Sequence, residues 1–320
     1  MVIGIIVLHL PLYQPLADSS LSFFDFIKAF FSHGVFRATV PVLTVMSGFL
    51  IFRSNIQTQP IRLFTKKVSA VFIPLVIWNI PFVAAIFLAQ KYDLVSHHFS
   101  AILYPFDPLS WLNALTGFLG TPANYPLNFL RDLFAVSLLS PLYWFFLKKS
   151  PYVGLLLLFV VYFLNLDGSF VLRNSMLISF YIGGLAFSQK WDLTYFDKHA
   201  KWLLILFLII CASIVLFKVE NRELFKLISP FLVWPSISLI VNTRLGGFLY
   251  EHSHASFFTF LAHGPIILIL WLVFQKIPLN IPYQVYWFTA PIITVYVSIL
   301  ICRCFKRWFP KLSALALGGR

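Results

Sequence analysis

Residues 68–89 read VSAVFIPLVIWNIPFVAAIFLA, a stretch without a charged side chain. A helix needs about 20 apolar residues to cross the hydrocarbon core of a bilayer, and this stretch has that length. Similar stretches recur along the 320 residues of the chain, of which 60% are hydrophobic and 11% are charged. Soluble domains carry roughly 25% charged residues. The composition therefore excludes a soluble globular enzyme and predicts a polytopic helical membrane protein.

We expect an all-α integral membrane protein with about ten transmembrane helices in a single bundle. The expected spans are 1–15, 35–52, 68–89, 127–147, 151–166, 175–189, 202–218, 224–242, 256–275 and 283–302. No repeat of fixed period and no linker divides the chain, so one domain is expected over residues 1–320. The first span is short, because only fourteen residues precede Pro15.

The longest connection, residues 90–126, predicts a further element. A bare loop of this length is unusual in a compact domain. Its middle, Leu109 to Leu119, is apolar but too short to cross a bilayer. We therefore expect a re-entrant or interfacial helix within the 90–126 loop.

The distribution of Lys and Arg residues predicts how the chain is oriented in a membrane. The chain has 24 Lys and Arg against 11 Asp and Glu, for a net charge of +13. The cations lie in short loops without interleaved aromatic residues, so the positive-inside rule explains them and no nucleic acid partner is expected. With a cytoplasmic N-terminus, fifteen cations lie inside and nine outside. This bias favours a cytoplasmic location for both ends of the chain.

Ionisable residues inside apolar spans are costly and need a reason. His9 lies in the first span, where it is either a neutral histidine bonded to a neighbouring helix or a functional group. His263 precedes Gly264 and Pro265, which free backbone groups inside the ninth span. This segment is either a structural kink or the wall of a polar chamber.

Arg131 and Asp132 are adjacent at the outer end of the fourth span. Neighbouring side chains on a helix point about 100° apart, so we expect these two to serve different partners rather than each other. The alternative is an interfacial arginine that reaches lipid phosphate beside a solvated aspartate.

A cation cluster of Arg62, Lys66 and Lys67 precedes the third span. It either sets topology or holds a phosphate-bearing ligand at the cytoplasmic mouth of the bundle. Signatures of nucleotide hydrolysis, Rossmann cofactors and α/β-hydrolases are absent from the sequence. The loop histidines lack acidic or thiol partners at metal-ligand spacing, so no metal site is expected. They are His97, His98, His252 and His254.

Several of these strings, in their order and spacing, resemble the bacterial membrane acyltransferase-3 family. They are VLH at 7–9, VPVLTVMSGFL at 40–50, KK at 66–67, IPLVIW at 73–78, NFLRDL at 128–133 and SFFTFLAHGP at 256–265. The resemblance runs essentially from end to end. It implies a ten-helix enzyme of the bacterial cytoplasmic membrane that moves an acyl group from acyl-CoA to a glycan hydroxyl.

The resemblance also implies roles for individual residues. His9 matches the histidine of the family's Arg-x10-His motif and would act as general base, while His263 would line or assist the chamber. Arg62, Lys66 and Lys67 would meet the phosphates of coenzyme A. The motif arginine would precede Met1, so we expect either an N-terminally truncated chain or a diverged relative. The family's RxxR reads Lys67-Val-Ser-Ala70, which keeps only the first cation.

The expected function is transfer of an acyl group to an envelope polysaccharide, a lipid-linked saccharide or a periplasmic glucan. Acetyl-CoA is the favoured co-substrate, a succinyl donor stays open, and no bound cofactor is expected. Arg131 and Asp132 are placed on the acceptor or oxyanion side. The alternative is a non-enzymatic transporter of a lipid-linked or glycan intermediate, because polar residues inside a bundle also suit a pathway.

Overall fold

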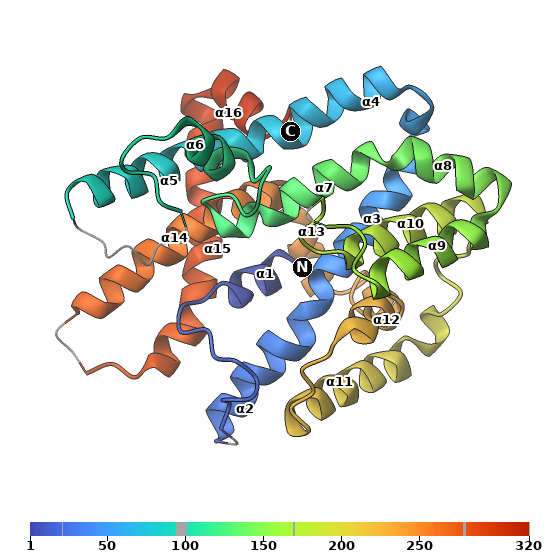
Figure 1. The fold of residues 1–320 in the computed structure, drawn as a ribbon. Coiled ribbons are helices and arrows are strands. Elements are labelled where there is room, and N and C mark those ends of the chain that lie inside the picture. Colours follow the sequence, from blue (N-terminus) through green and yellow to red (C-terminus); the bar gives the residue numbers. More distant parts are fainter. Residues whose placement is uncertain (21, 94–100, 169, 278–279, 320) are drawn as a thin grey trace. The chain divides into compact units, whose positions relative to one another are not determined.

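The computed structural model describes residues 1–20, 22–93, 101–168, 170–277 and 280–319. Every regular element in these ranges is a helix, as expected for an all-α protein (Figure 1). The chain forms two compact units. Unit 1 comprises Met1–Arg53 and Ile178–Ile299, and unit 2 comprises Ser54–Leu177 and Leu300–Arg320. His97 and His98 lie outside the described residues.

The helices divide between the two units, with 3-10 and π segments labelled η. Those that lie mainly in unit 1 are α1 (Val2–Leu8), α2 (Phe23–Ala29), η1 (Phe30–Gly34), η2 (Val35–Ala38), α3 (Thr39–Arg53), α10 (Ser175–Ser188), η6 (Asp197–His199), α11 (Ala200–Leu216), α12 (Glu223–Val233), η7 (Trp234–Leu239), α13 (Arg244–Glu251), η8 (Ser253–Ala255), α14 (Ser256–Lys276) and α15 (Tyr283–Trp308). Those in unit 2 are η3 (Ile56–Thr58), α4 (Pro60–Lys67), η4 (Val68–Phe72), α5 (Ile73–Lys91), α6 (Pro108–Thr116), η5 (Tyr125–Leu127), α7 (Asn128–Leu138), α8 (Ser140–Lys149), α9 (Pro151–Phe163) and α16 (Pro310–Ala316).

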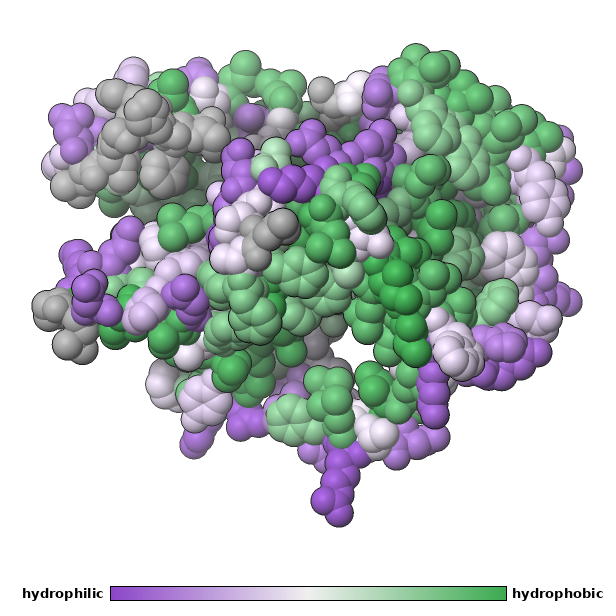
Figure 2. All heavy atoms as spheres, turned by 90° about the horizontal axis from the view of Figure 1, so that it is seen from below, coloured by the Kyte–Doolittle hydropathy of each residue, from purple (hydrophilic) through white to green (hydrophobic). Residues whose placement is uncertain are grey.

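Five helical segments of the described chain are long and apolar enough to cross a membrane. They are Phe23–Arg53, Pro60–Lys91, Asp197–Leu216, Ser253–Lys276 and Tyr283–Trp308. Two bent pairs raise this number to seven if each pair is one span. Figure 2 shows hydrophobic side chains over much of one face, with hydrophilic ones in patches between and around them. The structure thus supports a membrane protein, but it does not confirm ten spans.

The missing spans are helices that are bent or short. The expected span 127–147 is divided into α7 and α8, which meet at 51°, and the helix that follows residue 223 turns by 108° before α13. The expected spans 151–166 and 175–189 are the shorter helices Pro151–Phe163 and Ser175–Ser188. The expected span 1–15 is helical only over Val2–Leu8, so His9 caps the helix rather than lying inside it.

The helix expected inside the 90–126 connection is present as α6. The Asp107 side chain caps its first turn by accepting a hydrogen bond from the Ser110 backbone N–H at 2.7 Å. Hydrogen bonds from Ser110 lower the pKa of the Asp107 carboxyl, because they favour its charged form. Gly117 ends the helix with a φ of 72°, a left-handed conformation that suits glycine. Its interfacial position in a membrane stays a prediction.

Two glycines let α3 and α10 cross in backbone contact within unit 1. A Cβ at Gly48 would lie 2.1 Å from the Phe180 carbonyl oxygen, and a Cβ at Gly183 would lie 2.0 Å from the Val45 carbonyl oxygen. Small residues at helix crossings are the usual means of close packing in membranes. The close approach therefore requires glycine on both helices.

We expect Gly48→Ala and Gly183→Ala each to destabilise the protein by about 1–3 kcal/mol, because the added methyl group has to displace backbone atoms. Thermal unfolding of the purified protein in detergent measures this effect. Gly247→Ala is the matched control, since nothing lies within 4 Å of a Cβ at Gly247. An unfolding temperature for Gly48→Ala equal to that of the control would contradict the close packing.

Candidate active site

The helix that precedes His9 is fixed by packing inside unit 1. Ile6 and Val7 of α1 form a buried cluster with Ile267 of α14 and with Tyr286 and Trp287 of α15. Side chains three and four positions apart share a face of a helix, and α1 directs its apolar face at these two helices. This packing brings the C-terminal end of α1 beside α14.

His9 and His263 meet at this contact although they are 254 positions apart in the chain. His263 Nε2 lies 3.4 Å from His9 Nδ1. The ring centroids are 5.2 Å apart, with an angle of 58° between the ring planes. The structure thus joins the two histidines that the sequence analysis selected separately. The helix α14 continues through Gly264 and Pro265, so these residues do not end it.

Backbone carbonyls determine the proton positions on both rings. His263 Nδ1 lies 2.6 Å from the Phe260 carbonyl oxygen, and His9 Nδ1 lies 2.8 Å from the Ile5 carbonyl oxygen. A carbonyl only accepts, so each Nδ1 carries the hydrogen of the neutral ring. His263 Nε2 therefore presents a lone pair to the N–H of His9. On His9 the basic nitrogen is Nε2.

The two histidine rings differ in their exposure to solvent. His263 has no exposed surface, whereas His9 is partly exposed at the end of α1. A group that reacts with substrate has to be reachable, so His9 is the member of the pair suited to chemistry. His263 is suited to act through His9.

In unit 2, the structure corrects the expectation for Arg131 and Asp132. Arg131 Nη1 donates to Asp132 Oδ1 at 2.9 Å, so the two adjacent side chains form an ion pair with each other. The backbone angle between neighbours does not prevent this, because the long arginine side chain can fold back. Asp132 is fully buried and Arg131 is 8% exposed. The interpretation as a solvated aspartate is therefore wrong.

The same ion pair ties three segments together. Arg131 donates to the carbonyl oxygens of Gly117 at 3.0 Å and Phe170 at 2.7 Å. Asp132 accepts from the backbone N–H groups of Leu172 at 3.0 Å and Arg173 at 3.2 Å. Arg131 also lines a cavity of about 290 Å³ whose other walls are mainly apolar. Its position fits both a structural clasp and a cationic wall of a binding space.

We expect Asp132→Asn to lower the free energy of unfolding by about 3–5 kcal/mol, because Arg131 would keep a buried charge without a counter-ion. Loss of folded protein from membranes, or a lower unfolding temperature in detergent, measures the change. Asp93→Asn removes an exposed carboxylate from the same unit and should have little effect. Equal stability of the two variants would show that the buried pair is dispensable.

The cation cluster of α4 lies in unit 2. Lys66 is exposed, Lys67 is half-buried, and Arg62 donates to the Gln59 side chain at 3.2 Å. Arg62 and Lys66 are four positions apart and share a face of the helix. The π-helix η4 follows directly, and such segments are frequent at functional sites.

Two features of the structure have no counterpart among the residues predicted from the sequence. One is His33, which is buried inside the π-helix η1 in unit 1. The other is an apolar cavity of about 490 Å³ in unit 1, with aromatic walls that include Trp191, Phe231 and Trp234. None of the predicted site residues lines this cavity. A π-helix and a cavity depend on packing, so hydropathy gave no signal for either.

Comparison with known proteins identifies the family of the chain. A model of the acyltransferase-3 family, described as an acyltransferase domain, matches residues 1–303. The chain belongs to this family and is an acyltransferase. It is 28% identical over 332 residues to the succinoglycan biosynthesis protein ExoH of Rhizobium meliloti (strain 1021). That alignment covers 99% of this chain and 89% of the relative. No solved structure matches the chain.

Family membership decides between the two classes of function that the sequence left open. An acyltransferase needs an activated nucleophile, and a histidine side chain is able to act as the activating base. The chain is therefore an enzyme rather than a non-enzymatic transporter.

Proposed function

We propose that the protein is an O-acyltransferase of the bacterial inner membrane that moves an acetyl group from acetyl-CoA to a glycan hydroxyl. The contact of His9 with His263 is the observation that carries this proposal. The name of the relative, a succinoglycan biosynthesis protein, supports a polysaccharide or its precursor as acceptor. The acceptor is an envelope polysaccharide, a lipid-linked saccharide or a periplasmic glucan.

In the proposed reaction, His9 Nε2 takes the proton of the acceptor hydroxyl. The hydroxyl oxygen attacks the thioester carbonyl carbon, the new C–O bond forms, and the C–S bond breaks. The imidazolium then returns its proton to the departing thiolate, which leaves as coenzyme A. A positioned general base of this kind contributes about 10²- to 10⁴-fold to a rate.

His263 supports His9 in this scheme as a positioning residue. When His9 gains a proton at Nε2, the charge spreads to the Nδ1–H, which faces the Ile5 carbonyl and His263 Nε2. Both acceptors stabilise the imidazolium and hold the ring in one orientation. His263 is fully buried, so it does this without contact with the acceptor.

The cationic residues of unit 2 complete the proposal. Arg62, Lys66 and Lys67 are proposed to bind the phosphates of coenzyme A, which suit clustered cations. Arg131 is proposed as the cation on the acceptor or oxyanion side, because it lines a cavity and Asp132 holds it in place. Among the acceptors, the 490 Å³ apolar cavity favours a lipid-linked saccharide, since its walls suit a hydrocarbon chain.

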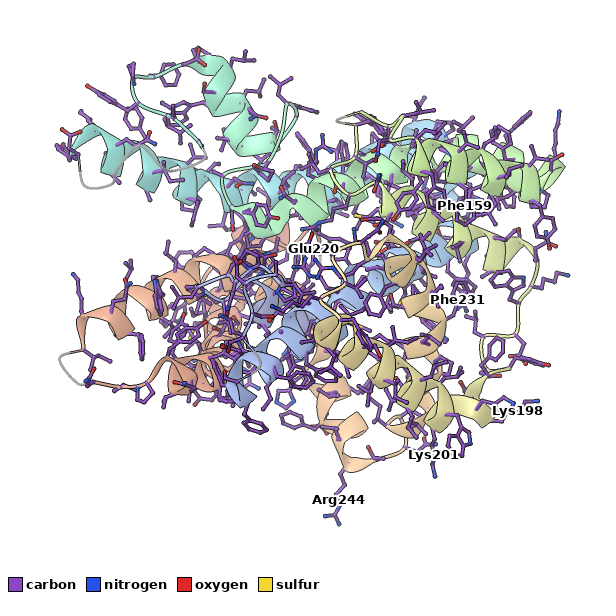
Figure 3. All side chains as sticks on the ribbon, turned by 60° about the horizontal axis from the view of Figure 1, so that its bottom comes forward. Phe159, Lys198, Lys201, Glu220, Phe231 and Arg244 are labelled. Carbon is purple, nitrogen blue, oxygen red and sulfur yellow. The ribbon has the colours of Figure 1, made fainter. Side chains whose placement is uncertain are left out.

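We further propose one domain over residues 1–320 with both chain ends in the cytoplasm. The family match to residues 1–303 includes most of both units, which supports a single functional domain. Figure 3 shows Lys198, Lys201 and Arg244 pointing outward near one edge of unit 1. Glu220 lies toward the opposite end of α11 from the two lysines. Lys218 and Arg222 also lie in the segment of Glu220, so the support for cytoplasmic chain ends is the count of cations over all loops, fifteen against nine.

Replacement of His9 should remove the base. We expect His9→Ala to lower ester formation by about 10²- to 10⁴-fold at unchanged expression. Base-labile O-acyl esters on envelope glycans, measured by mass spectrometry in a complemented deletion strain, report the activity. The lipid extract and the water-soluble glycans are assayed separately, which locates the acceptor.

His254→Ala is the control for the His9 experiment, because it removes an exposed histidine from the same unit. Full rescue by His9→Ala, or ester content unaffected by deletion of the gene, would contradict the proposal.

Removal of positive charge tests the proposed binding site for coenzyme A. We expect the double variant Lys66→Gln, Lys67→Gln to raise the KM for acetyl-CoA about tenfold at nearly unchanged kcat, because hydrogen bonds to charged groups contribute about 1.5–3 kcal/mol. Isolated membranes with varied acetyl-CoA provide the measurement. The double variant Lys148→Gln, Lys149→Gln removes another lysine pair of unit 2 and is the control. A similar KM in both double variants would refute the assignment.

A further inference from the structure

The chain leaves α1 at His9, and residues 10–20 form an irregular loop on the N-terminal side of α2, which begins at Phe23. Leu12 has a φ of 60°, a left-handed conformation that prevents continuation of the helix. Carbonyl groups in such a loop lose their helical partners and need donors from elsewhere, especially where water is scarce. The loop that follows His9 obtains these donors from side chains.

Four carbonyl oxygens of this loop each accept a hydrogen bond from a side chain of another segment of unit 1. The bonds run from Tyr283 Oη to Pro11 at 2.6 Å, from Lys28 Nζ to Leu12 at 2.8 Å, from His33 Nε2 to Gln14 at 2.9 Å, and from Lys218 Nζ to Ala17 at 2.7 Å. The donors come from α15, α2, η1 and the segment that follows α11. We refer to these four donors as the loop clamp.

His33 differs from the other three donors because a second residue determines its protonation. It is 3% exposed, and Arg222 Nη1 lies 2.9 Å from its Nδ1 and 3.4 Å from its carbonyl oxygen. A guanidinium only donates, so Nδ1 of His33 accepts. The hydrogen of the neutral ring is then on Nε2, where it is donated to the Gln14 carbonyl. Arg222 thus holds His33 as the tautomer that binds the loop.

The hydrogen bond between His33 and Gln14 lies near His9, the candidate base, along the chain. Gln14 is five positions from His9, and the small crevice of about 20 Å³ beside the loop is lined by Leu8, Leu10 and His33 among others. This volume admits about one water molecule, so the loop lies close to Leu8 and Leu10 at the end of α1. Movement of the loop would displace the end of α1 and with it the His9 ring.

We propose that His33 and Arg222 are positioning residues for the acyl transfer, which hold the loop after α1 so that His9 keeps its contact with His263. This inference rests on the proposed function of His9. Neither residue takes up or releases a proton of the substrate. Their contribution is to the geometry of the base, and a base displaced by about 1 Å loses on the order of 10²-fold in rate.

Two isosteric replacements separate the contact of His33 with the Gln14 carbonyl from its contact with Arg222. In His33→Gln, the side-chain amide reaches the position of Nε2 and donates to the Gln14 carbonyl. In His33→Asn, the side-chain oxygen takes the position of Nδ1 and accepts from Arg222, but the bond to the loop is lost. If the loop bond matters, the glutamine variant retains function and the asparagine variant does not.

Full-length variants are measured in isolated membranes with acetyl-CoA and the endogenous acceptor. We expect His33→Asn to lower the maximal rate of ester formation at least tenfold with an unchanged KM for acetyl-CoA, and His33→Gln to stay within threefold of the wild type. Hydrogen exchange of residues 10–20 should accelerate in His33→Asn alone. His254→Asn, at an exposed histidine, is the control.

The outcomes distinguish the two levels of inference. Equal rates in His33→Asn and His33→Gln, or unchanged exchange of residues 10–20 in His33→Asn, would overturn the positioning role. If the wild type forms no ester above membranes without the protein, the proposed function fails. The exchange measurement still tests the clamp in that case, because it requires no turnover. Unfolding temperatures of all variants show whether a loss of rate reflects a loss of fold.

Discussion

A polar group that leaves water in an apolar helical protein has to find its hydrogen-bond partner within the protein, and the structure of unit 1 follows from that requirement. The first helix ends at Leu8, and the chain beyond it presents carbonyl groups without helical donors. Side chains from later parts of the chain supply the missing donors. The same carbonyl chemistry fixes the tautomers of His9 and His263, whereas Arg222 and the Gln14 carbonyl together fix that of His33.

The polar clusters around Asp132 and around His9 use this requirement differently. In unit 2, Asp132 is surrounded by donors from Arg131, Leu172 and Arg173, and a fully satisfied buried carboxylate serves mainly to join segments. In unit 1, His9 is partly exposed, and the His9 atom that contacts His263 is Nδ1 rather than the basic Nε2. One cluster therefore suits structure and the other suits proton transfer.

Hydropathy predicted the long apolar helices, because each of them is a run of consecutive apolar residues in the sequence. It overestimated the length of the first span. Leu10 and Leu12 are apolar, but the chain turns at Leu12, whose carbonyl oxygen accepts a hydrogen bond from Lys28. Hydropathy also missed the bend before Arg244, because composition gives the length of an apolar segment but not the direction of the helix axis. The expectation that Arg131 and Asp132 do not pair with each other was wrong, because backbone angles do not limit a long side chain.

The sequence by itself determined the class of protein, the family resemblance and the identity of both histidines of the pair, because each of these depends on local composition or on short strings. Tertiary structure alone decided that His9 and His263 meet, that His33 holds the loop after His9, and which nitrogen of each ring is protonated. The reason is physical: residues 254 positions apart come into contact through the packing of α1 against α14, and no local pattern records that packing.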